Sequence, residues 1–117
     1  MTVSIDFESR STVDLRRTGV YRYAQDASTD VWCMAYAFND EEPKVWRPGN
    51  PLDQSLIEYI EAGGELRAWN SQFERVIWND ILAKRYGWPT TSVDQWVCTA
   101  AEARAMALPG SLGQAAD

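Results

Sequence analysis

The sequence predicts an α/β domain in which helices pack against a mixed sheet whose first three strands are antiparallel. Residues 3–9 alternate apolar and polar side chains with a period of two, which is typical of a strand. An apolar run at 31–38 and a short run at 44–46 flank turn residues, which predicts a hairpin that pairs with the first strand. Helical patterns follow at 52–60 and 71–86, so the elements run strand, hairpin, helix, strand, helix, helix.

The composition is that of one globular domain. The 117 residues are 45% hydrophobic and 24% charged, and we expect them (1–117) to share a single core. The sequence has no apolar run of membrane-spanning length and no signal-peptide pattern. Cys33 and Cys98 have no metal-ligand spacing, and we interpret them as buried side chains in a reducing compartment. These features together predict a cytoplasmic protein.

The chain contains no histidine, which removes the commonest general base and transition-metal ligand. Hydrolytic chemistry would therefore depend on carboxylates, hydroxyls or a bound hard cation. The net charge of −6 argues against nucleic-acid binding over the whole surface. It does not exclude a nuclease, because bound cations reverse the local field of an acidic site. The six tryptophans indicate either a large core or a stacking surface.

Asp6 and Glu8 lie two residues apart on the first predicted strand, so both project from one face at a spacing of about 6–7 Å. Two like charges on one face repel each other. The pair is compatible with a solvated acidic edge strand or with a cation held between the carboxylates.

The segment 10–30 is polar and has no clear period, so we predict an irregular loop. This loop either contacts phosphates beside the acidic strand or is simply solvated. Four arginines cluster in it around Gly19: Arg10, Arg16, Arg17 and Arg22.

The remaining elements are delimited by turn and cap residues. Asn50 and Pro51 resemble a helix N-cap and first position, and Gly63-Gly64 ends that helix before a brief strand at 65–69. The clearest helix, 71–86, ends at the G-W-P sequence 87–89. The Ala-rich stretch 93–108 is predicted to be mostly helical, and Ser111 to begin another helix. A chain that stops at Asp117, as this last helix begins, is expected to be part of a larger domain.

Glu74 falls in the first turn of the helix 71–86, where a carboxylate has two interpretations. Ser71-x-x-Glu74 has the spacing of a capping box, in which the glutamate bonds back to the cap's backbone N–H. The other interpretation, in which Glu74 is a metal ligand, is implied only by a family resemblance.

The motif Asp6-Phe7-Glu8, followed by N-x-x-F-E from Asn70 to Glu74, resembles the first two motifs of the DnaQ-like (DEDD) 3′–5′ exonucleases. The stretches I-D-F-E-S-R-S, A-W-N-S-Q-F-E-R-V-I-W, C-T-A-A-E-A-R-A and L-P-G-S-L are similar to the exonuclease domain at the N-terminus of bacteriophage family A DNA polymerases. The resemblance covers essentially the whole chain. It implies an RNase H-like fold and a proofreading-type exonuclease that works with a polymerase domain on a single-stranded DNA 3′ end.

The resemblance also implies roles for individual residues. Asp6 matches the carboxylate that bridges two divalent cations, and Glu8 matches one that binds a single cation and contacts the 3′-terminal nucleotide or the water. Glu74 stands where the family more often has aspartate. Phe7, Asn70 and Phe73 match substrate-positioning sites. The implied cofactor is Mg²⁺ or Mn²⁺, and two such cations about 3.5–4 Å apart activate the attacking oxygen and stabilise the leaving one.

The third motif of the family, Y-x-x-x-D or H-x-x-x-x-D on a later helix, is missing. The sole Y-x-x-x-D, Tyr36 to Asp40, runs from a predicted strand into a turn and precedes the second motif. We therefore expect a domain truncated before its last metal ligand, with weak or no activity as an isolated chain. The alternative is a non-catalytic RNase H-like interaction or scaffold module. An incomplete domain should also expose apolar surface on its Ala-rich C-terminal helix and form a homodimer through it.

Overall fold

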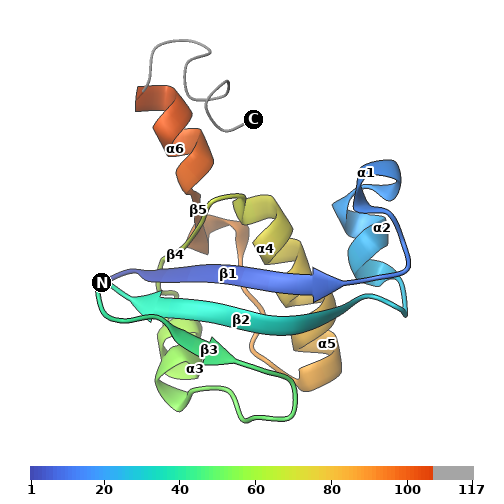
Figure 1. The fold of residues 1–117 in the computed structure, drawn as a ribbon. Helices are drawn as coiled ribbons and strands as arrows, with labels where there is room; N and C mark the ends of the chain where they lie inside the picture. The colour runs from blue at the N-terminus through green and yellow to red at the C-terminus, as the bar shows by residue number, and fades with distance from the viewer. Residues whose placement is uncertain (107–117) are drawn as a thin grey trace.

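The computed structural model describes residues 1–106, which fold into one five-stranded sheet with the strand order β3-β2-β1-β4-β5 (Figure 1). The central strand β1 (Val3–Arg10) is antiparallel to β2 (Asp30–Phe38), and β2 is antiparallel to β3 (Lys44–Trp46). On the other side, β4 (Leu66–Ala68) and β5 (Trp96–Cys98) run parallel to β1. The predicted mixed sheet with three antiparallel first strands is confirmed.

The alternation of β1 sets the two faces of the sheet. Val3, Ile5 and Phe7 are buried, whereas Asp6 and Glu8 are exposed. The buried set faces the helices, and burying three such side chains stabilises the fold by several kcal/mol, at about 1.5–3 kcal/mol each. A one-residue slip of this strand would place the carboxylates in the core, so the register is strongly specified.

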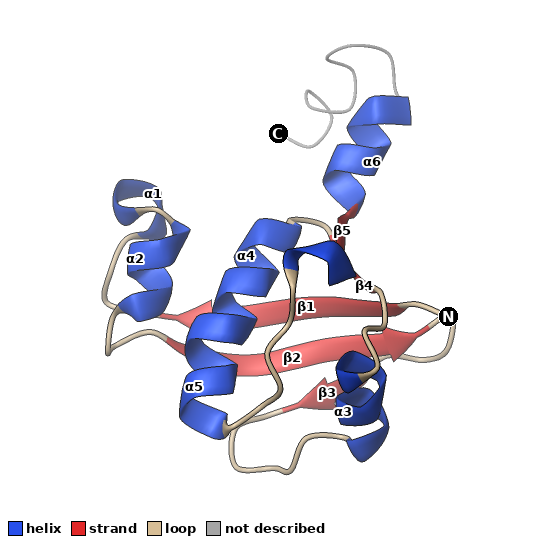
Figure 2. Cartoon of the chain, turned by 180° about the vertical axis from the view of Figure 1, so that it is seen from behind, coloured by secondary structure: helices blue, strands red, loops and turns tan. Residues whose placement is uncertain are grey.

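The helices after β3 cover one face of the sheet (Figure 2). They are α3 (Gln54–Glu61), α4 (Ser71–Ile77) and α5 (Ala83–Tyr86), with a π-helical segment (Trp78–Leu82) joining the last two. Among the described residues no helix lies over the opposite face, which carries Asp6 and Glu8. We call it the open face. The last described element, α6 (Thr99–Met106), extends from the end of β5 away from the sheet (Figure 1).

The predicted helix 71–86 is confirmed as a continuous helical rod, interrupted in hydrogen-bond pattern by the π-helical segment. It ends at Gly87, which adopts φ +73°, a conformation that glycine accepts without strain. The helix α3 starts later than predicted. Its N-cap is Asp53, whose carboxylate accepts from the Ser55 N–H at 2.9 Å, and not Asn50. The Asn50-Pro51 signal was outcompeted by a second, equally good cap three residues further on.

Four of the six tryptophans form the core, and two do not. Trp46, Trp78, Trp88 and Trp96 are buried, with ring centroids of Trp78 and Trp88 4.8 Å apart. Trp32 and Trp69 are 60% and 55% exposed. The core interpretation is therefore confirmed for four tryptophans, while a stacking role for the two exposed ones stays a prediction.

The segment 10–30 is not the predicted irregular loop. It contains two short helices, α1 (Leu15–Thr18) and α2 (Val20–Gln25), separated by Gly19 at φ +80°. Asp14 caps α1 by accepting from the Arg16 N–H, and α2 buries Tyr23 and Ala24. Because each helix has only about one turn, neither generates a recognisable period in the sequence.

The stretch 93–108, predicted to be mostly helical, is helical in most of its described part but also contains a strand. A 3₁₀ turn (Val93–Gln95) leads into β5, and helix begins only at Thr99. The W-V-C sequence of β5 pairs in parallel with β4 and forms the edge of the sheet, and its valine and tryptophan favour a strand over a helix. At the start of α6, Ala100 is buried and Ala101 is exposed, and the expected homodimer through this helix stays a prediction. The predictions at 109–111 lie outside the described residues, and no described helix is long and apolar enough to cross a membrane.

Candidate functional site

The first part of the site is the acidic side of β1. Asp6 and Glu8 both point from the open face, and their partners across the β1–β2 ladder are Ala35 and Cys33. These neighbours are small, so no bulky side chain covers the carboxylates. Neither acid has an ion pair among the described residues. The alternation predicted from the sequence is confirmed for both residues.

Glu74 reaches this strand from the first turn of α4. Its side chain is 6% exposed, and its Oε2 accepts a hydrogen bond from the backbone N–H of Phe7 at 3.1 Å. Phe7 is the residue between Asp6 and Glu8. The strand β4 pairs with β1 only at Val3 and Ser4, so further along β1 this edge has no strand beside it. The carboxylate of Glu74 takes the place of a strand carbonyl and satisfies a buried donor.

The capping-box interpretation of Glu74 is therefore wrong. The N-cap of α4 is Asn70, not Ser71, and no side chain caps this helix end. The Asn70 carbonyl accepts from the Glu74 N–H at 3.3 Å, while the Glu74 carboxylate is turned to β1. The spacing of a capping box is present in the sequence, but the buried N–H of Phe7 outcompetes the solvated helix end for the carboxylate.

Burial raises the pKa of Glu74 to about 8, against an ordinary value of 4.5. The hydrogen bond from Phe7 lowers this pKa, and the negative charges of Asp6 and Glu8 raise it. Near neutral pH the Glu74 carboxyl is thus mostly protonated. A cation near these three groups favours the ionised form, because an opposite charge offsets both the burial and the repulsion.

The three carboxyl groups do not form a ready-made cation cage. Within residues 1–106, no three His, Cys, Asp or Glu side chains are close enough together to hold a metal ion. Asp6 and Glu8 point out of the open face, while Glu74 is directed to the edge of β1. Their oxygen donors match the preference of Mg²⁺ and Mn²⁺. The chemistry of the donors therefore suits such an ion, while the described positions of the three groups do not gather around one point.

The three predicted substrate-positioning residues have different surroundings. The Phe7 side chain lies in the core, 6.1 Å between ring centroids from Trp78, so its accessible contribution is its backbone. Asn70 is exposed at the start of α4, with no hydrogen bond from its side chain among the described residues. Phe73 is half-buried and packs against Tyr23 of α2 at 6.3 Å. Asn70 is thus the one whose side chain is free to contact a ligand.

The rejected third-motif match is separated in the structure as expected. Tyr36 is buried in β2 and donates to the Asp53 carboxylate at 3.1 Å, while Asp40 lies in the turn after the strand. Burial and the neighbouring Asp53 raise the pKa of Tyr36 to about 12. Tyr36 therefore has a structural role, since its buried side chain joins β2 to the N-cap of α3.

One residue beside the acids was missed in the sequence. Opposite Glu8 and Ser9 the β1–β2 register shifts, since Glu8 pairs with Cys33 and Ser9 with Val31. Trp32 therefore has no partner on β1, and this bulge turns its side chain outward. In an unbroken strand the alternation would bury Trp32 and expose Val31. The continuous apolar run at 31–38 contains no signal for this reversal.

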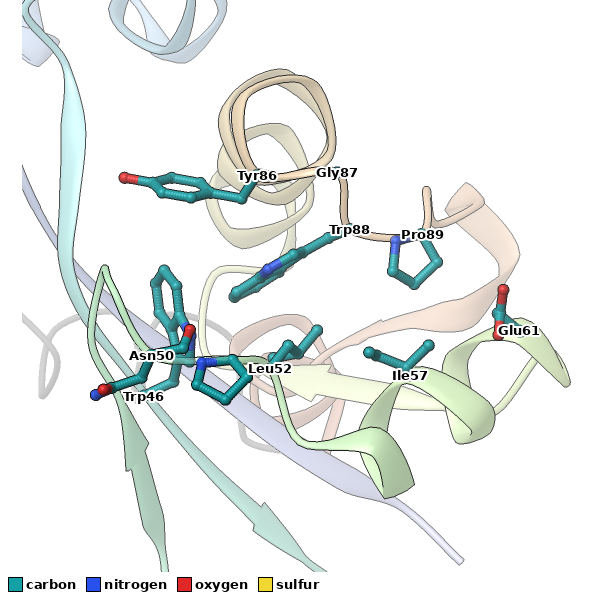
Figure 3. A pocket seen from close by; sticks show the side chains of 10 residues that line it. Trp46, Asn50, Leu52, Ile57, Glu61, Tyr86, Gly87, Trp88 and Pro89 are labelled. Carbon is teal, nitrogen blue, oxygen red and sulfur yellow. The ribbon is translucent and has the colours of Figure 1, made fainter.

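A separate pocket lies on the helical side of the molecule (Figure 3). It has a volume of about 360 Å³ and contains none of the acidic residues of the candidate site. Three rings from β3 and the end of α5 line it together with residues of the α3 region and one acid, Glu61, at its end. The exposed lining is about equally polar and apolar and includes no nucleophile paired with a base. The rings are those of Trp46, Tyr86 and Trp88.

The fold and the site define an α/β domain whose central strand carries an acidic pair joined to a helix by a third carboxyl group. The chain is similar to a DNA polymerase of Bacillus phage SP02, with 33% identity over 114 residues. The matched region is 95% of this chain but 17% of the polymerase. No protein-family model and no solved structure matches the sequence. The similarity supports a polymerase-related domain, and the chain spans a small part of that relative.

Proposed function

We propose that the chain is an RNase H-like 3′–5′ exonuclease domain of a phage-type DNA polymerase, in which Asp6, Glu8 and Glu74 bind Mg²⁺ or Mn²⁺. The observation that carries the proposal is the hydrogen bond between Phe7 and Glu74. It joins the two motifs, 67 residues apart, at the residue that separates the two exposed acids. The mixed sheet and the similarity to a phage polymerase are consistent with the same assignment.

In this proposal the residues have distinct tasks. Asp6 and Glu8 supply oxygen ligands from one exposed face, and Glu74 adds a third carboxylate that ionises when a cation approaches. The cations, when bound, supply an activated water and charge stabilisation for phosphodiester hydrolysis. Asn70, whose side chain is exposed at the start of α4, contacts the substrate strand in this proposal. The longer chain of a polymerase would provide the remaining ligand, so activity of residues 1–117 alone is expected to be weak.

Trp32 extends the proposed substrate site. Its exposed ring lies on β2 opposite the step from Glu8 to Ser9. The bulge directs the ring to solvent, so the fold forgoes the stabilisation that burying it would give. Stacking of a base on such a ring is worth about 1–3 kcal/mol and tolerates any sequence. We assign Trp32 to stacking with a base near the 3′ end.

The test is metal-dependent trimming of a 5′-labelled single strand, resolved to one nucleotide. With Mn²⁺ we expect products shortened stepwise from the 3′ end, and none from Asp6→Asn. The matched control is Glu58→Gln, an exposed acid on α3 with no ion pair among the described residues. Internal cleavage, or equal trimming by Asp6→Asn, would contradict the proposal.

A second candidate function has its own supporting observation, the pocket of Figure 3. A pocket of about 360 Å³ is of the size that binds ligands. Its mixed polar and apolar lining favours a non-catalytic interaction module that holds a partner segment with an aromatic or apolar side chain there. In that case Trp88→Ala abolishes the function, while Asp6→Asn and Glu8→Gln leave it intact and raise stability by relieving repulsion. Loss of function in the two acid variants excludes this candidate.

A further inference from the structure

The helical pair α1–α2 concentrates positive charge in an acidic protein. Between residues 10 and 25 the chain has four arginines and a single acid, Asp14, although its net charge is −6. The four arginines are exposed and have no ion pair among the described residues. Asp14 turns its carboxylate to the Arg16 N–H, so it caps α1 and does not pair with a guanidinium. The arginines are Arg10, Arg16, Arg17 and Arg22.

This pair is anchored at its base, unlike a solvated loop. The Ser11 hydroxyl, which precedes α1, forms hydrogen bonds with the hydroxyls of Ser28 and Thr29, which follow α2. Arg85 of α5 donates to the backbone carbonyls of Asp26 and Thr29. An anchored segment keeps its charges in fixed positions, so less conformational entropy is lost when a ligand binds.

The helix α2 contacts both halves of the candidate site. The Tyr23 hydroxyl is 3.0 Å from the Ser9 hydroxyl, and Ser9 directly follows Glu8. The ring of Tyr23 also packs at 6.3 Å from Phe73, which directly precedes Glu74. The α1–α2 pair, which carries three of these arginines, thus stands at the end of β1 (Figure 1).

We propose that the α1–α2 pair is a binding site for the phosphate backbone of single-stranded DNA that leads to the acidic strand. Exposed, unpaired guanidiniums are suited to phosphate oxygens, which they can engage with two parallel hydrogen bonds. The two sites carry opposite charges that suit different ligands. The arginines of α1–α2 bind the negative phosphate backbone, whereas the acids of β1 bind cations. This inference rests on the proposed function for the choice of DNA as the polyanion.

The test measures binding of a 5′-fluorescein oligothymidine of about 15 nucleotides by anisotropy, in EDTA, across a NaCl series. Three phosphate contacts predict that Arg16→Gln/Arg17→Gln/Arg22→Gln reduces the slope of log Kd against log[NaCl] by about 2, at about 0.7 per phosphate for a single strand. At low salt the triple variant is expected to bind roughly tenfold more weakly or worse. Its melting temperature should stay within a few degrees of wild type, because the three side chains have no ion pairs to lose.

The matched control removes the same charge elsewhere, with Lys44→Gln/Arg47→Gln/Lys84→Gln. These side chains are exposed, although Lys44 and Lys84 are in ion pairs with Asp53 (3.6 Å) and Asp80 (3.8 Å), so the melting temperature of the control is measured too. The control is expected to leave the salt slope nearly unchanged. An unchanged slope in the Arg16, Arg17 and Arg22 variant overturns the proposal, as does an equal reduction in the control. The EDTA separates this result from the proposed nuclease function. If wild type binds the strand with the arginine-dependent salt slope but does not trim it in Mn²⁺, the nuclease is refuted and the phosphate site still stands.

Discussion

The backbone N–H of Phe7 donates to the carboxylate of Glu74 at 3.1 Å, so a buried acid of α4 closes the edge of β1 where β4 no longer pairs with it. Removing the Glu74 carboxylate leaves the buried N–H of Phe7 without a hydrogen-bond acceptor. Glu74→Ala is expected to lower the free energy of unfolding by about 2–3 kcal/mol at acidic pH, whereas Glu74→Gln keeps an acceptor and loses less than about 1 kcal/mol. Chemical denaturation near pH 5 compares the two. Equal losses in both variants would show that the hydrogen bond contributes little.

The raised pKa of Glu74 makes stability depend on pH in a definite direction. The folded pKa of about 8 lies above the ordinary 4.5, so between these values the folded state holds a proton that the unfolded state has released. Stability from this group is therefore full below pH 4.5, falls as pH rises, and is lost above pH 8. The loss is on the order of 5 kcal/mol, at about 1.4 kcal/mol for each pH unit between the two pKa values. Unfolding curves at several pH values should show this decline in wild type and in Glu58→Gln but not in Glu74→Gln, and a decline preserved in Glu74→Gln contradicts it.

Asp6 acts on Glu74 through charge, since its carboxylate raises the pKa of Glu74. Asp6→Asn should therefore lower that pKa and raise stability at about pH 8 in the absence of cations, by about 0.5–1 kcal/mol. Carbon-detected NMR titration of the Glu74 carboxyl follows the pKa directly. A pKa of Glu74 that is unchanged in Asp6→Asn would mean that the two groups do not share one site.

Substitutions of Trp32, the residue at the bulge, distinguish a ligand-binding role of its ring from a structural one. Because the ring is 60% exposed, Trp32→Ala should change stability by less than about 1 kcal/mol. It should weaken binding of a single strand by about 1–3 kcal/mol, and Trp32→Phe should recover part of that loss through its smaller ring. Val93→Ala, also exposed and outside the site, is the control. Undiminished affinity in Trp32→Ala excludes stacking on this ring.

How much the sequence predicted depends on the length of the pattern behind each feature. The long alternation around Asp6 and the helical stripe of 71–86 determined the strand, the helix and both faces, because many side chains agree on one period. The one-turn helices around Gly19 and the three-residue strand at Trp96 carry too few residues for a period, so tertiary pairing decides them.

The candidate site shows the same division between local and distant causes. Asp6 and Glu8 could be placed together from their spacing alone. The contact of Glu74 could not, because the spacing from Ser71 is equally typical of a capping box. The choice is made by the N–H of Phe7, a donor 67 residues away that exists only once β1 extends beyond β4. The exposure of Trp32 could not be predicted for a related reason, since a register shift between two strands is not visible in the sequence of either strand.

The most direct test of the central claim, that Asp6, Glu8 and Glu74 form one cation site, is a Mn²⁺ titration followed by electron paramagnetic resonance at about pH 8. We predict that wild type and Glu58→Gln bind Mn²⁺ at millimolar or lower concentration. Asp6→Asn should lose this binding, and Glu8→Gln and Glu74→Gln should each weaken it by about tenfold or more. Absence of binding in wild type at millimolar Mn²⁺, or equal binding by wild type and Asp6→Asn, would contradict the account.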